Sequence, residues 1–277
     1  MTQGTVLITG CSSGIGLDAA RTLNDRGWRV LASCRQDADC QRLKSEGLES
    51  FVLDYSSSES VQAGARQALE LTGGRLDALF NNGAFAIPGL VEDLPRDALR
   101  SVFETNLFGQ FELIRAVIPA MRQQGHGRII NCSSVLGFTA LPFRGAYTAS
   151  KFAMEGLTDT LRLEMRDTSI QIALIEPGPI RTRIRENSIA HFERWIDWQS
   201  SARRQDYESR LRPRLYEPST KKDRFELPPG AVTEKLIHAL ESAQARPRYY
   251  VTMPTYIVGM LKRVLGTRWL DRVLSSR

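Results

Sequence analysis

The stretch TVLITGCSSGIG, from Thr5 to Gly16, decides the fold of this chain. Its first five residues are apolar or β-branched, as in a buried strand. Glycines follow at positions 10, 14 and 16, and the segment GIGLDAARTLNDRG then places apolar residues at the three- and four-residue spacing of a helix. A strand, a glycine-rich turn and a helix in this order predict the first crossover of a parallel sheet.

The rest of the chain repeats this alternation of apolar runs with segments of helical period. Strand and helix in regular order imply right-handed crossovers and a parallel sheet that helices cover on both faces. We therefore predict an α/β, doubly wound Rossmann fold of about seven parallel strands. No repeat and no low-complexity linker interrupts it, so we interpret residues 1–277 as a single domain. The most distinct strand segments are TVLIT (5–9), WRVLAS (28–33), SFVLD (50–54), LDALF (76–80), RIINC (128–132) and IQIALIE (170–176).

Composition narrows the class of protein. The 277 residues are 42% hydrophobic and 25% charged, as in a soluble globular protein and unlike a disordered or fibrous one. The net charge of +6 arises mostly in residues 181–224 and in the last 32 residues. A nucleic-acid partner would require a basic face with interleaved aromatic residues in a recognisable module, and the sequence contains no such module. We expect no nucleic-acid partner.

The cysteines and histidines indicate neither a disulfide framework nor a metal site. The four cysteines form no Cys-x-x-Cys pair, which favours a reduced, cytoplasmic compartment over a disulfide framework. The N-terminus has no basic leader, and its apolar run is too short for a signal peptide. We expect no metal site, since the three histidines are scattered along the chain, at His126, His191 and His238.

The glycine-rich turn is the first candidate site, because a doubly wound sheet binds ligands at the carboxyl ends of its strands. Its glycines allow a tight turn and a close approach of backbone to a pyrophosphate, which would face the N-terminus of the following helix. The alternative is a turn with a structural role only. The residues expected to hold a dinucleotide there are Gly10, Ser12, Ser13, Gly14, Ile15 and Gly16.

The residues at the end of the second strand indicate which dinucleotide the protein binds. Proteins that bind NAD usually place a carboxylate there for the ribose diol, but this chain has Cys34 followed by Arg35. A guanidinium can bind a 2′-phosphate through two hydrogen bonds, so we predict NADP(H). Arg35 could instead be a solvated residue. Asp54, after the third strand, is expected to contact the adenine amino group, or to cap the helix that follows.

Several motifs together resemble those of the classical short-chain dehydrogenases/reductases with a Gly-x-x-x-Gly-x-Gly loop. The similarity covers about residues 4–182, and its later segments resemble the branch that contains 17β-hydroxysteroid and retinol dehydrogenases and bacterial NADP-dependent aldehyde reductases. One departure is that Asn82 precedes Gly83-Ala84, where the family usually has Ala-Gly. The motifs are TGCSSGIG (9–16), NNGA (81–84), Asn106, Ser134, Tyr147-x-x-x-Lys151 and PGPIRT (177–182).

The resemblance implies a role for each matched residue. Tyr147 would be the general acid and base, and Ser134 would orient the substrate oxygen. Lys151, one helical turn from the phenol, would lower its pKa and hold the nicotinamide ribose. Asn106 would fix a water in the proton relay. Ser133 remains an alternative to Ser134, and Asn106 could be an ordinary polar residue on a helix. Further cofactor contacts are implied for Asn82, Gly83, Pro177, Gly178, Ile180 and Thr182.

Two segments lie beyond the motifs. Residues 183–228 are polar, arginine-rich and aromatic, and we interpret them as a lid over the substrate. The apolar side chains of Phe192, Trp195 and Ile196 would cover an apolar substrate or pack the lid on its domain. Residues 254–275 form a basic amphipathic pattern with no run long enough to span a bilayer. This helix could contact a membrane surface, the substrate cleft or a second subunit.

The function that we predict is an NADP(H)-dependent oxidoreductase that interconverts a carbonyl and an alcohol of a small apolar substrate. The expected direction is reduction of an aldehyde or ketone. Two alternatives stay open, namely oxidation of a steroid or retinoid alcohol, and an NADPH-sensing module without turnover. We expect a cytoplasmic homo-oligomer. An alternative is a protein that also contacts a membrane surface through its last helix.

Overall fold

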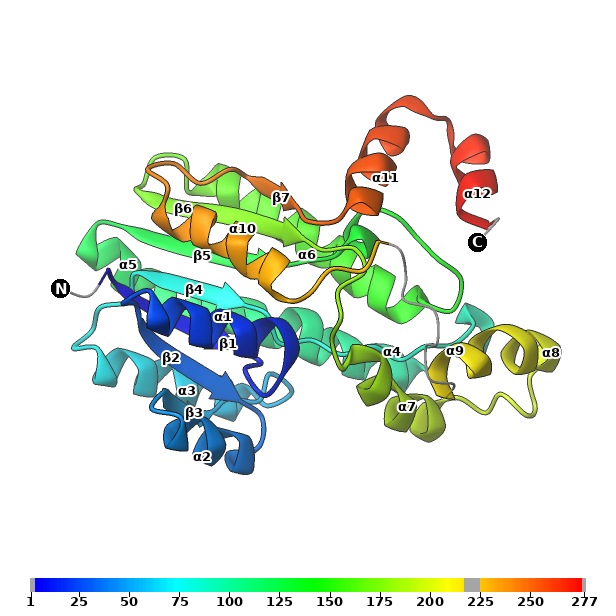
Figure 1. Cartoon of the computed structure of the whole chain (residues 1–277), viewed down its shortest axis with the longest axis horizontal. Coiled ribbons are helices and arrows are strands. Elements are labelled where there is room, and N and C mark those ends of the chain that lie inside the picture. Colours follow the sequence, from blue (N-terminus) through cyan, green and yellow to red (C-terminus); the bar gives the residue numbers. More distant parts are fainter. Residues whose placement is uncertain (1–2, 217–224, 276–277) are drawn as a thin grey trace.

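The computed structural model describes residues 3–216 and 225–275. Its centre is a sheet of seven strands in the order β3-β2-β1-β4-β5-β6-β7, and every neighbouring pair is parallel (Figure 1). The order reverses between β1 and β4, so ligands should bind beyond the carboxyl ends of these strands. The strands are β1 (Thr5–Thr9), β2 (Arg29–Cys34), β3 (Glu49–Val52), β4 (Ala78–Asn81), β5 (Gly127–Cys132), β6 (Ile170–Glu176) and β7 (Arg248–Tyr250).

Helices cover both faces of the sheet, as predicted (Figure 1). Within β1, Val6 and Ile8 are buried in one apolar cluster and Leu7 is buried in the other. This alternation follows from the two-residue period of a strand. The first cluster is covered by α1 (Gly14–Asp25), α2 (Asp37–Ser45) and α10 (Gly230–Glu241), and the second by α3 (Ser58–Leu71), α5 (Gly109–Gln124) and α6 (Gly145–Glu164).

A third apolar cluster contains much of the predicted lid. Phe192 and Ile196 are buried in it, against side chains that include Ile87 and Phe143. These two lid residues therefore pack the segment on its domain. Residues 217–224 of the predicted lid lie outside the described residues. Around this cluster lie α4 (Arg96–Phe103), the π-helical turn η2 (Glu104–Phe108), α7 (Ile184–Trp195), α8 (Arg204–Asp206), η4 (Tyr207–Leu211) and α9 (Arg212–Tyr216), and the short turns η1 (Val91–Asp93) and η3 (Val135–Gly137) complete the loops after β4 and β5.

The C-terminal segment differs from its prediction. Residues 254–275 were expected to be one helix, but they lie in α11 (Met253–Val264) and α12 (Thr267–Ser275). Leu265 has extended backbone angles, and Gly266 follows it. Glycine is a poor helix former, which explains the break. Among the described residues, no helix has the length and apolar character that a membrane span requires.

Candidate active site

The glycine-rich loop after β1 makes contacts so close that only glycine fits at these positions. Gly10 and Gly14 have φ angles of +69° and +58°, which L side chains rarely adopt. A Cβ on Gly10 would lie 2.7 Å from the Cα of Gly83, and a Cβ on Gly16 would lie 2.4 Å from the carbonyl oxygen of Gly10. The loops after β1 and β4 thus lie backbone against backbone, as the motif requires.

The N-terminus of α1 fits an anionic group such as the pyrophosphate of a dinucleotide. Ser13 stands at the N-cap position, yet its side chain makes no capping hydrogen bond, and the first turn contains no acidic residue. The backbone N–H groups of that turn and the helix dipole therefore favour an anion at this position. Arg42 lies alongside and donates a hydrogen bond of 2.8 Å to the carbonyl of Ser12. Residues 12–16 would hold the phosphates there.

Arg35 is exposed directly after β2, next to this loop. It also lies near α7, because its charge contributes to lowering the pKa of His191, for which burial is the larger cause. The ring of His191 lies 4.3 Å, centroid to centroid, from that of Phe85 in the loop after β4. The helix α7 therefore lies across the carboxyl edge of the sheet, beside the expected position of the cofactor ribose.

Asp54 holds a turn and does not cap the helix. Its Oδ1 accepts hydrogen bonds from the backbone N–H of Ser56, at 2.9 Å, and from the Ser56 hydroxyl, at 2.8 Å. The N-cap of α3 is Ser57, whose side chain accepts from the N–H of Ser60. The capping alternative is therefore wrong, and the adenine contact stays a prediction.

The two serines after β5 face different partners. Ser133 donates a hydrogen bond of 2.5 Å to Oε1 of Glu155 and is buried. Ser134 lies near the Tyr147 hydroxyl, where it opposes the rise of the phenol pKa, and its own oxygen accepts from the N–H of Leu136 at 3.1 Å. Successive residues of an extended segment point to opposite sides, so only one of the two can reach the phenol. That residue is Ser134.

Lys151 lies beneath the phenol, with its ammonium 5.6 Å from the centroid of the Tyr147 ring. It is fully buried, and its Nζ donates a hydrogen bond of 2.7 Å to the carbonyl of Cys132. Burial lowers the pKa of Lys151 to about 8. The lysine thus bridges helix α6 to the end of β5.

The phenol pKa is raised in the chain by itself, and the lowering effect expected of Lys151 stays a prediction. Burial raises the pKa of Tyr147, and the proximity of Cys132 adds to this, while the hydrogen bond with Ser134 and the charge of Arg144 oppose it. Moving a phenolate from water into the protein interior costs more free energy than Ser134 and the charge of Arg144 recover. The Lys151 ammonium, moreover, is engaged with a carbonyl. At neutral pH the phenol therefore keeps its proton.

Asn106 lies in the π-helical turn η2 and is completely buried. Its Nδ2 donates to the carbonyl of Phe85, at 2.9 Å, and to the Ser150 hydroxyl, at 3.2 Å, while its Oδ1 accepts from the N–H of Phe85 at 3.0 Å. The side chain thus fastens the loop after β4 to α6, the helix of Tyr147. Its contribution to a water relay stays a prediction.

The PGPIRT segment after β6 reaches the glycine-rich loop. Thr182 is the residue that a Cβ on Gly14 would meet, at 3.1 Å. Pro177 accepts a backbone hydrogen bond of 2.7 Å from Val135, and Ile180 pairs with Leu227 through an isolated bridge. The residues predicted to surround a cofactor are therefore brought together from the ends of β1, β2, β4, β5 and β6.

A buried polar network behind the site was not predicted. Asn81 and Asn131 are opposite each other in the pairing of β4 with β5, and their side chains are joined by a hydrogen bond of 2.9 Å. The Tyr55 hydroxyl donates to Asn81 at 2.5 Å and lies 2.9 Å from the Thr9 hydroxyl. Thr9 in turn accepts from the N–H of Asn82 at 2.9 Å. The available signal was an asparagine at the end of each apolar run, LFN and IIN.

No group of three or more histidine, cysteine, aspartate or glutamate side chains in the described ranges could hold a metal ion. The four cysteines are free and buried.

The parallel sheet and its carboxyl-edge site define a nucleotide-binding protein of the Rossmann class. A model of the short chain dehydrogenase family matches residues 4–192, and the chain belongs to this family of oxidoreductases. The family resemblance and the fold are thereby confirmed.

Three comparisons give the range of similarity. The chain is 39% identical over 275 residues to the uncharacterized oxidoreductase YbbO of Escherichia coli (strain K12), covering 99% of this chain and 95% of that protein. It is 37% identical over 196 residues to retinol dehydrogenase 8 of Homo sapiens, covering 67% of this chain and 62% of that protein. A crystal structure of a short-chain dehydrogenase from Streptomyces avermitilis matches with a TM-score of 0.80 at 25% identity, covering 100% and 99% of the two chains.

Proposed function

We propose that this protein interconverts a carbonyl and an alcohol with NADP(H), and that Tyr147 transfers the proton. The observation that carries the proposal is the approach of Ser134 to the Tyr147 hydroxyl above the buried Lys151. A serine and a phenol directed at one point can hold a substrate oxygen between them. The bound nicotinamide would supply the hydride.

The protonated phenol supports the reducing direction. Because burial raises the pKa of Tyr147, its hydroxyl is a donor at neutral pH. As a carbonyl carbon gains a hydride, its oxygen gains negative charge, and the Tyr147 proton moves to that oxygen while Ser134 donates a hydrogen bond to it. Lys151 lies with its ammonium 5.6 Å from the centroid of the Tyr147 ring, and its positive charge would stabilise a newly formed phenolate.

The preference for NADP(H) rests on Arg35. No carboxylate stands at the end of β2 to accept hydrogen bonds from a ribose diol, whereas Arg35 is exposed there. Arg42 also lies near the loop, but it is paired with Asp39 and Glu46. Charge-assisted hydrogen bonds of about 1.5–3 kcal/mol favour a 2′-phosphate roughly tenfold to a hundredfold. Among the residues expected at the cofactor, Gly10, Gly14 and Gly16 let this loop pack closely on itself and on the segments after β4 and β6.

The substrate that we propose is a fairly apolar aldehyde or ketone. Support comes from the partly buried apolar side chains that pack against the third cluster, among them Phe85 of the loop after β4 and Ile189 of α7. Oxidation of a steroid or retinoid alcohol is the second candidate, and the 37% identity to retinol dehydrogenase 8 favours its retinoid form. Both candidates use the same four side chains, Asn106, Ser134, Tyr147 and Lys151.

Initial rates test the proposal. Aldehydes, ketones and alcohols, retinoids and steroids included, would be compared with NADPH or NADH for reduction and with NADP⁺ or NAD⁺ for oxidation, following the nicotinamide absorbance. We expect turnover of apolar aldehydes or ketones with a KM for NADPH at least about tenfold below that for NADH. Equal KM values would remove the NADP(H) preference. Binding of NADPH without turnover of any substrate would instead support the sensing module.

A further inference from the structure

One face of α11 is apolar and exposed. Met253, Tyr256, Ile257, Met260 and Val264 follow the three- and four-residue spacing of a helical stripe, and all are exposed, with 61% of Met260 and 76% of Val264 open to solvent. The opposite face is buried on the domain through Pro254, Thr255, Val258 and Gly259. The helix is thus anchored by one side and displays an apolar side outward.

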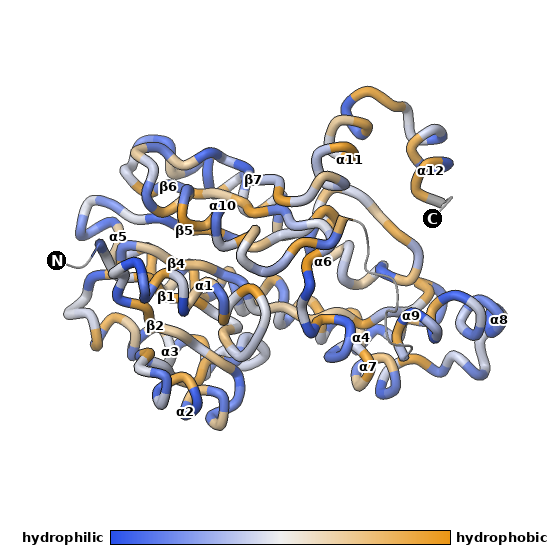
Figure 2. The backbone as a smooth tube through the Cα atoms, viewed as in Figure 1, coloured by the Kyte–Doolittle hydropathy of each residue, from blue (hydrophilic) through white to orange (hydrophobic). Residues whose placement is uncertain are grey.

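The next helix extends this surface. In α12, Trp269 is 61% exposed and Val273 is 39% exposed. Figure 1 shows α11 and α12 projecting from the body of the sheet, and Figure 2 shows apolar residues along both. An apolar surface of this extent on a projecting pair of helices indicates a binding partner.

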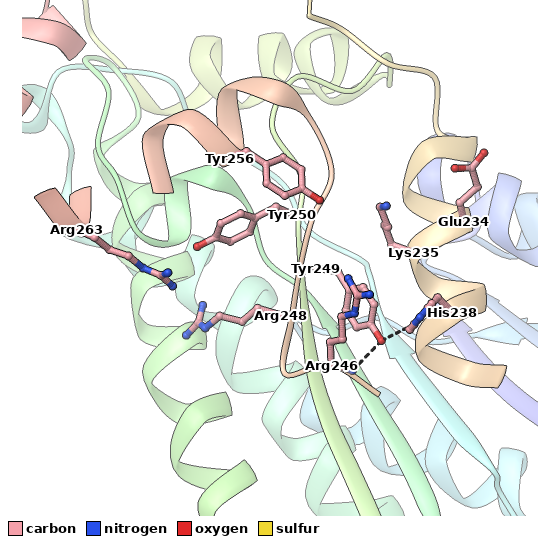
Figure 3. A pocket seen from close by; sticks show the side chains of 9 residues that line it. All are labelled: Glu234, Lys235, His238, Arg246, Arg248, Tyr249, Tyr250, Tyr256 and Arg263. Atoms are coloured by element: carbon pink, nitrogen blue, oxygen red, sulfur yellow. Dashed lines mark hydrogen bonds between the residues drawn. The ribbon is translucent and has the colours of Figure 1, made fainter. Parts of the chain in front are cut away.

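Positive charge surrounds the apolar surface. Residues 253–275 contain the cations Lys262, Arg263, Arg268 and Arg272 and the single acid Asp271. Arg263 also lines a cavity of about 500 Å³, together with Tyr256 of α11, Lys235 of α10 and the two arginines before and within β7, Arg246 and Arg248 (Figure 3). Glu234 of α10 also lines this cavity, and Arg248 is paired with three carboxylates, so the positive charge that faces a partner is carried by α11 and α12.

An anionic partner matches this charge. A second copy of the chain docked face to face would bring two cationic surfaces together, which electrostatic repulsion opposes. An anionic bilayer would accept apolar side chains and a tryptophan at its interface, with lysine and arginine at the level of the phosphates. We propose that α11 and α12 bind the surface of an anionic phospholipid membrane.

The buried face of α11, which anchors the membrane-binding face on the domain, lies next to the candidate active site. Thr252 and Thr255, at the start of α11, are the residues that a Cβ on Gly178 would meet, and Gly178 belongs to the segment expected at the cofactor. Membrane binding itself does not depend on the proposed reaction.

Vesicle co-sedimentation of the full chain tests the proposal. We expect binding to vesicles of phosphatidylcholine with phosphatidylglycerol, little binding to phosphatidylcholine alone, and weaker binding as salt is raised. The double variant Met260→Glu with Val264→Glu should reduce the partition coefficient at least about tenfold. Arg263→Gln and Arg268→Gln should each reduce it roughly fivefold.

Leu163→Glu is the matched control. Leu163 is an apolar side chain that is 56% exposed at the far end of α6, and this variant should bind vesicles as the unchanged protein does. Failure of the unchanged protein to sediment with anionic vesicles would overturn the proposal, as would equal binding by the double variant. If light scattering shows that the double variant dissociates an oligomer, and no vesicle binding is seen, the face is covered by a second copy.

Discussion

Ser133 donates a hydrogen bond of 2.5 Å to Glu155, one helical turn beyond Lys151 on α6. Glu155 is in turn paired with Arg248 from β7. The serine next to the candidate catalytic position is therefore committed to a buried ionic cluster. Ser134 is therefore the serine that can act together with Tyr147. Ser133 has a structural role.

Replacing the two serines should give different losses. Ser134→Ala should lower kcat/KM at least about a hundredfold and leave NADPH affinity unchanged, because the substrate oxygen loses a donor. Ser133→Ala should instead cost about 1–3 kcal/mol in the free energy of unfolding, since Glu155 is left with an unsatisfied oxygen. Steady-state kinetics and urea unfolding of both variants check this. A larger kinetic loss in the Ser133 variant would reverse the assignment.

Tyr147→Phe removes the proton donor and keeps the ring. We expect turnover to fall by about two orders of magnitude or more. NADPH binding, followed by fluorescence titration, should be retained because the ring still packs beside Lys151. Near-normal turnover in this variant would rule out Tyr147 as the proton donor.

Arg35→Ala should change cofactor selectivity. Loss of the guanidinium removes the charge-assisted bonds to a 2′-phosphate, so the KM for NADPH should rise roughly tenfold to a hundredfold while the KM for NADH stays constant. Arg21→Ala is a control, because Arg21 is an exposed arginine that pairs with Glu46. An equal rise for both cofactors would argue against a phosphate contact.

Lys151 should make stability depend on pH. Its pKa is lowered to about 8 in the folded chain from an ordinary value of 10.5, so its buried charge opposes folding below pH 8. Between these two values the unfolded chain keeps a proton that the folded chain has released, and the free energy of unfolding rises with pH. The slope of this contribution is at most about 1.4 kcal/mol per pH unit. Urea unfolding of the unchanged protein and of Lys151→Met, from neutral to alkaline pH, should show this rise only in the former.

Arg248 is expected to be the most important residue of the ionic cluster for stability. It pairs with Glu155, Asp159 and the completely buried Glu176, whose pKa is raised by burial and by the charge of Glu155. Arg248→Met should cost about 3–5 kcal/mol in the free energy of unfolding, because it leaves buried carboxylates without a counter-charge. Adding Glu176→Gln should recover part of this loss. No recovery in the double variant would show that the loss arises from packing.

Local patterns predicted much of the fold. The runs at 5–9 and 170–176 coincide with β1 and β6, and the other four predicted strands overlap their counterparts with ends shifted by at most two residues. Buried parallel strands are continuous apolar runs, and that signal is local. The seventh strand, Arg248–Tyr250, has three residues and two charged or polar ends, so its own sequence carries little signal. The break at Leu265–Gly266 was missed because the apolar spacing continues across it.

The sequence by itself determined the order of strands and helices, the glycine-rich turn and the four-residue spacing of Tyr147 and Lys151, since these depend on neighbours along the chain. Tertiary structure decided which of Ser133 and Ser134 meets the phenol, and that burial, not Lys151, dominates the pKa of Tyr147. It also joined Glu155 of α6 to Arg248 of β7, which lie far apart in sequence. Proton affinity depends on how completely the fold excludes water from a group and on which charges it brings near, and neither can be read from adjacent residues.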